Sequence, residues 1–126
     1  MTNTYRANFL RIALIVTGLT FIFGIYLLSI VWPSGWTWGH GHSHYLMMII
    51  GVYATLGIFL IIASRSPDTH RSLIWFTIWS SVIHAAIMGA QSLSDTGEHG
   101  HLIGDIPALL LIAIVLAVLM PRAKRA

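Results

Sequence analysis

Four long apolar stretches run along the chain, each separated from the next by a short polar segment. The first two, residues 12–32 and 45–64, contain no charged side chain. A helix of about 20 apolar residues can cross a hydrocarbon layer about 30 Å thick. The pattern therefore predicts four membrane-spanning helices, over residues of about 10–32, 44–64, 72–93 and 102–120.

Prolines mark the ends of these stretches. Pro67 follows the second stretch and Pro121 follows the fourth, and neither can continue the hydrogen bonding of a helix. Pro107 lies near the start of the fourth, where the first helical turn tolerates a missing N–H. Because the connections are short, we expect one all-α domain over residues 1–126, an integral membrane four-helix bundle.

The composition supports a membrane setting. Hydrophobic residues make up 56% of the chain and charged residues only 9%, which is too little polar surface for a soluble globule. The chain contains no cysteine, and this excludes disulfides, thiolate metal sites and covalent haem attachment through a Cys-x-x-Cys-His motif. The few basic residues flank the apolar stretches, so we expect the lipid bilayer as partner and no nucleic acid.

The positions of the charges predict the topology. If both termini are cytoplasmic, all seven Lys and Arg residues fall on the cytoplasmic side, as the positive-inside rule requires. This predicts a multi-pass protein of the bacterial cytoplasmic (inner) membrane. Two histidine-rich segments, GHGHSH at 39–44 and EHGH at 98–101, then lie together on the extracytoplasmic side, and His70 lies inside.

The histidine-rich segments are candidates for a metal site. Neutral imidazoles with a carboxylate suit a transition metal such as Cu, Zn or Fe. His40 and His44 are four residues apart, and so are His101 and Asp105, a spacing that lets the imidazole and the carboxylate share a hydrogen bond or a cation. The candidate metal ligands are His40, His42, His44, His99, His101 and Asp105. The alternative is that these histidines bond lipid headgroups and loop carbonyls.

The third stretch carries polar side chains on one helical face: Thr77, Ser80, Ser81, His84, Met88 and Gln91. A histidine within the bilayer is costly to desolvate, so His84 is expected to have a partner. That partner is a hydrogen-bonding group such as Ser80 or one on another helix, a haem, or a quinone carbonyl. Ser80, Met88 and Gln91 complete the candidate cofactor-binding set.

Small residues recur four apart in the second and third stretches, at Gly51 with Thr55 and at Ala85 with Gly89. Such pairs let membrane helices approach closely, and we expect helix contacts at these positions.

Several motifs carry a family resemblance over nearly the whole chain. They are WPSGWTWGHGH at 32–42, YATLGIFL at 53–60, RSLIWFTIWSSVIHA at 71–85 and HGHLIGD at 99–105. With them the chain resembles a bacterial family of small four-span membrane proteins of unknown function. Its layout is more distantly similar to DoxX-like four-helix membrane proteins.

Three functions remain open at this point. The first is a binding or accessory protein that holds a transition metal at the histidine-rich side. The second is a haem- or quinone-linked redox component that uses His84. The third is a non-catalytic subunit of a larger membrane complex, with a homo-oligomer as a further possibility. No nucleophile elbow or phosphate-binding glycine motif occurs, so no catalytic residue is assigned and the question of an enzyme stays open.

Overall fold

The computed structural model describes residues 2–36, 44–94 and 96–120, and all the regular structure in these ranges is helical. The prediction of an all-α protein is confirmed for them. The elements, in chain order, are α1 (Thr2–Leu19), the π-helical turn η1 (Thr20–Gly24), α2 (Ile25–Val31), α3 (Pro33–Trp36), α4 (His44–Ala63), the 3-10 turn η2 (Pro67–His70), α5 (Arg71–Ser94), the 3-10 turn η3 (Thr96–Leu102) and α6 (Asp105–Leu119).

Three helical segments of the described chain are long and apolar enough to cross a membrane: Thr4–Val31, Pro67–Ser94 and His99–Leu119. The first of these is nearly continuous, because α1 runs through η1 into α2 without leaving helical geometry. A shorter apolar segment, Met47–Ala63, makes up most of α4. These four segments correspond to the four apolar stretches of the sequence.

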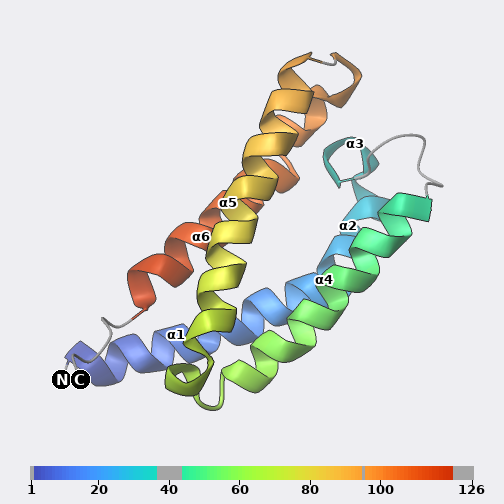
Figure 1. Cartoon of the computed structure of the whole chain (residues 1–126). Helices are drawn as coiled ribbons and strands as arrows, with labels where there is room; N and C mark the ends of the chain where they lie inside the picture. Colours follow the sequence, from blue (N-terminus) through green and yellow to red (C-terminus); the bar gives the residue numbers. More distant parts are fainter. Residues whose placement is uncertain (1, 37–43, 95, 121–126) are drawn as a thin grey trace.

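The helices form two pairs (Figure 1). The continuous helix α1 to α2 packs along α4, and α5 packs along α6. The start of α1, the end of α6 and the turn η2 share one end of the molecule, while α3 and η3 lie at the other. The pairs touch near the shared end and diverge away from it, until α3 packs against η3 at the far end.

Arg6 ties the start of the chain to the end of α6. Its guanidinium donates hydrogen bonds to the carbonyl oxygens of Leu119 (3.2 Å), Met120 (3.0 Å) and Val118. The last carbonyls of a helix have no partner within it and carry the negative end of the helix dipole. Arg6 therefore caps α6 with a positive charge.

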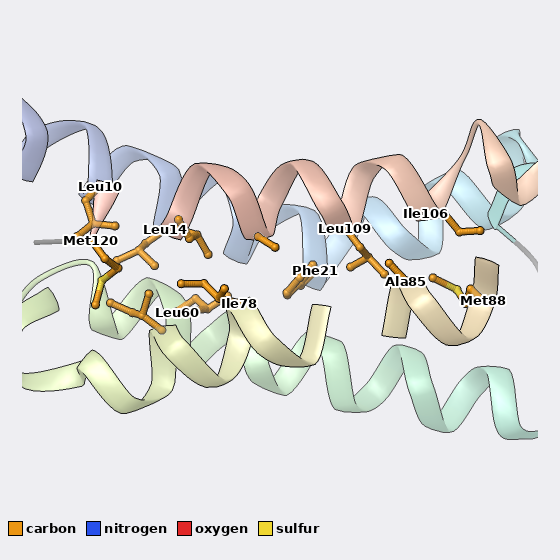
Figure 2. Packing of buried hydrophobic residues seen from close by; sticks show 13 residues of the cluster. Leu10, Leu14, Phe21, Leu60, Ile78, Ala85, Met88, Ile106, Leu109 and Met120 are labelled. Atoms are coloured by element: carbon orange, nitrogen blue, oxygen red, sulfur yellow. The ribbon is translucent and has the colours of Figure 1, made fainter. Parts of the chain in front are cut away.

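The core lies where the two pairs meet (Figure 2). Leu10, Leu14 and Phe21 of the first helix contact a cluster that includes Leu60 of α4 and Ile78 of α5. Farther along, Ala85 and Met88 of α5 pack against Ile106 and Leu109 of α6. Large apolar side chains also cover the outside of every long helix, among them Phe23, Val52, Phe76, Trp79 and Ile114. Such a surface is compatible with contact to lipid.

Helices α1 and α4 approach each other closely at Gly18 and Gly57. A Cβ on Gly57 would lie 2.5 Å from the carbonyl oxygen of Gly18. The expectation of close contacts at Gly51 and Gly89 is wrong, because a Cβ added at either residue would meet nothing within 4 Å. Neither Gly18 nor Gly57 has a small residue four positions away, so this spacing did not indicate their contact. Only the rotation of each helix about its axis decided which glycines face a neighbour.

Candidate functional site

A buried histidine and carboxylate pair lies at the end of the molecule formed by α3 and η3. The Nδ1 atom of His101 lies 2.8 Å from Oδ1 of Asp105, and the side chains are 0% and 11% exposed. Asp105 is the first residue of α6, where the helix dipole favours a negative charge. The predicted pairing of these two residues is confirmed, although His101 lies in the 3-10 turn η3 and not in the α-helix.

The short helix α3 packs on η3, next to this pair in the chain. Gly100 of η3 lies directly against the backbone of Ser34, where a Cβ would clash with the Ser34 carbonyl group. His99 of η3 and His44, the first residue of α4, are both exposed. His40 and His42 lie outside the described residues. The described residues that flank them in the sequence are Trp36 and His44.

Within the described ranges, no group of three or more His, Asp or Glu side chains is placed to hold a metal ion. Of the candidate ligands, the structure brings together His101 and Asp105. The metal site as a whole therefore remains a prediction.

Two buried polar atoms near this end have no hydrogen-bond partner among the described residues: Nε1 of Trp36 in α3 and Oγ of Ser92 in α5. Ser92 is 0% exposed. Buried polar atoms are almost always satisfied, so these two atoms are exceptions within the described part of the chain.

A second polar contact lies deeper, between the two helix pairs. The hydroxyl of Tyr53 on α4 is hydrogen-bonded to Nδ1 of His84 on α5. The Tyr53 ring is held from the other side by Phe21, edge to face, with ring centroids 4.9 Å apart. The expectation that His84 has a partner is confirmed, and the partner belongs to another helix.

Phe21 owes its position to the π-helical turn η1, of which it is the one buried residue. Single π-turns inside α-helices occur frequently at functional sites, because the wider turn redirects side chains. Here the turn lies beside Tyr53, so the irregularity coincides with the deeper polar contact.

The other residues of the predicted cofactor-binding set are dispersed. Ser80 is half-buried and donates to the carbonyl oxygen of Thr77, Met88 lies in the apolar core, and Gln91 is exposed. Ser92, the next residue after Gln91 in α5, is buried instead.

Sequence reasoning missed Tyr53. The signal that could have found it is a hydroxyl near the middle of an apolar stretch, since such a group needs a partner in a bilayer as much as a histidine does. The π-turn has no comparable signal in the sequence.

Comparison with known proteins gives one family and one partial relative. The model of a family of unknown function, DUF6632, matches residues 4–125. A ferric-chelate reductase 1 from Bos taurus is 34% identical over 82 residues, which make up 64% of this chain and only 13% of that protein. This chain thus corresponds to a small part of that relative. No solved structure matches the chain.

Proposed function

Since the chain belongs to the DUF6632 family, a family of unknown function, we propose its role from its own side chains. It is a redox-related membrane protein that holds a transition metal at its histidine-rich end, as a binding or accessory protein. The metal is Cu, Zn or Fe, and the candidate ligands are His40, His42, His44, His99 and His101, with Asp105 either as a further ligand or as the group that orients His101.

The observation that carries this proposal is the buried contact between His101 and Asp105. Histidines that bind metals commonly have one ring nitrogen held by a carboxylate, which fixes the tautomer and makes the other nitrogen a better ligand. Asp105 holds Nδ1 of His101 in this way, so the imidazole would bind a metal through Nε2. The relative's name, ferric-chelate reductase, supports a redox setting.

The topology supports the same site. The start of α1, the end of α6 and the turn η2 share one end of the molecule, and the basic residues in the described ranges, Arg6, Arg11, Arg65 and Arg71, belong to this end. By the positive-inside rule this end is cytoplasmic. The chain then spans the bacterial inner membrane four times, and the histidine-rich end faces the extracytoplasmic side.

Metal analysis tests the proposal. The protein, purified in mild detergent without an affinity tag that binds metals, is loaded with Cu, Zn or Fe, desalted and assayed by mass spectrometry. We expect a stoichiometric metal in the wild type and its loss in His101→Ala. His70→Ala is the matched control, because it removes one histidine from the opposite end. Equal metal content in wild type and His101→Ala would refute the site.

A second candidate, a haem- or quinone-linked redox component, is favoured by the contact between Tyr53 and His84. A histidine placed inside a span and oriented by another helix is a common marker of a functional site in membrane proteins. An absorption spectrum of the purified protein tests the haem form of this candidate: a haem on His84 gives a Soret band that disappears in His84→Ala. If the spectrum lacks that band, His84 binds no haem, and the quinone-linked form of this candidate is the one that stands.

A further inference from the structure

The two ring nitrogens of His84 differ in their surroundings. Nδ1 is bonded to the Tyr53 hydroxyl, and within the described residues His84 makes no other hydrogen bond. His84 is half-buried, so the residue is not enclosed completely by the protein. His84 also lies near the middle of the 24-residue helix α5. In the hydrocarbon layer no water is present to satisfy the second nitrogen, Nε2.

The hydrogen bond itself indicates which nitrogen of His84 carries the proton. If Nδ1 donated to the Tyr53 oxygen, the phenol O–H would be left without an acceptor, since Tyr53 has no other hydrogen bond in the described chain. If instead the phenol donates to Nδ1, the Tyr53 hydroxyl and Nδ1 are both satisfied. The second arrangement places the imidazole proton on Nε2. One polar hydrogen, Nε2–H, then remains to be matched by an acceptor.

This tautomer decides between ligand classes. A ring nitrogen that carries a proton has no lone pair to offer iron, so Nε2 does not suit a haem. It suits an oxygen acceptor. Lipid ester carbonyls are excluded by depth, because His84 lies about ten residues, or about 15 Å, from the end of α5 at Ser94.

We propose that the Tyr53 and His84 pair binds the carbonyl group of a membrane-soluble quinone, with Nε2–H of His84 as the donor. A quinone brings a carbonyl oxygen into the hydrocarbon layer, and its flat ring can pack against an aromatic side chain such as that of the half-buried Tyr53. Tyr53 acts as a positioning residue, since its hydroxyl holds His84 in the donor tautomer. This inference rests on the second candidate function and narrows it to quinone.

The tautomer is measurable directly. In protein labelled with 15N-histidine and reconstituted in lipid, the chemical shifts of Nδ1 and Nε2 distinguish the two forms of His84. We expect the Nε2–H form in the wild type and a mixture of both forms in Tyr53→Phe, which has no hydroxyl to hold Nδ1. Tyr26→Phe is the control. It removes a hydroxyl from an exposed position of α2 and should leave the tautomer of His84 unchanged. A wild type in the Nδ1–H form would overturn the proposal.

Quinone binding is tested with decylubiquinone, titrated into the reconstituted protein and followed by the quenching of tryptophan fluorescence, a signal that the wild type and both variants share. We expect saturable binding in the wild type, weaker by about tenfold in Tyr53→Phe and abolished in His84→Phe, as for the loss of one hydrogen bond and of the donor itself. Binding that is equal in wild type and His84→Phe would refute the site. A circular dichroism spectrum confirms that each variant folds.

The same preparations separate this inference from the metal site. Metal retained with no effect of decylubiquinone would refute the quinone site alone. Decylubiquinone bound at His84 with no metal would refute the metal site alone.

Discussion

Gly18 and Gly57 bring the backbones of α1 and α4 into contact, because a Cβ on Gly57 would lie only 2.5 Å from the carbonyl oxygen of Gly18. Gly57 lies four residues, or about one helical turn, from Tyr53 on α4. The glycine contact therefore helps to set the distance between Tyr53 and Phe21 of the first helix.

Replacement of Gly57 by Ala should destabilise the fold. The added methyl group forces α1 and α4 apart, at a cost of about 1 to 3 kcal/mol for an overpacked contact. The loss is measured as a lower midpoint of unfolding in detergent. Gly51→Ala on the same helix is the control, since its Cβ meets nothing within 4 Å. Similar midpoints for the two variants would contradict the close contact.

Removal of the Arg6 side chain should loosen the end of α6. Its guanidinium bonds to the carbonyls of Val118, Leu119 and Met120, and hydrogen bonds from a charged donor contribute about 1.5 to 3 kcal/mol. Arg6→Ala should speed amide hydrogen exchange in the last turn of α6. Arg11→Ala removes the same charge from an exposed position of α1. Unchanged exchange in Arg6→Ala would show that the cap does not hold α6.

Substitution of Asp105 by Asn should weaken metal binding at the histidine-rich end. The amide keeps the shape of the carboxylate but not its charge, so His101 becomes a poorer ligand. Loss of such a supporting carboxylate typically costs 10- to 100-fold in metal affinity, and a competition titration with a metal-binding dye measures it. Asp68→Asn, an exposed acid in the turn η2, is the control. If Asp105→Asn and Asp68→Asn both bound the metal with the affinity of the wild type, Asp105 would have no role in metal binding.

The proposed topology is testable by labelling, because the chain has no cysteine of its own. Ser94→Cys, an exposed position at the end of α5, should react with a membrane-impermeant maleimide in intact spheroplasts. Asp68→Cys, exposed at the other end, should react only after the membrane is permeabilised. The reverse pattern would place the histidine-rich end in the cytoplasm and overturn the charge argument.

Much of the fold and part of the candidate site could be predicted from the sequence. Continuous apolar character over about 20 residues suffices to indicate a helix that can cross a membrane, and charge placement suggests which ends lie together. The pairing of His101 with Asp105 was also accessible, because a spacing of four residues depends only on local chain geometry.

The contacts between helices were decided by the tertiary structure. Helices α4 and α6 are apolar on nearly every side, so no polar stripe indicates which face points inward. The sequence therefore could not show that Tyr53 meets His84, that Gly57 rather than Gly51 meets a neighbour, or that Ser92 rather than Gln91 is buried. Hydropathy and spacing are local properties that the sequence by itself determines. The rotation of each helix about its axis, and the π-turn that places Phe21, result from packing against distant parts of the chain.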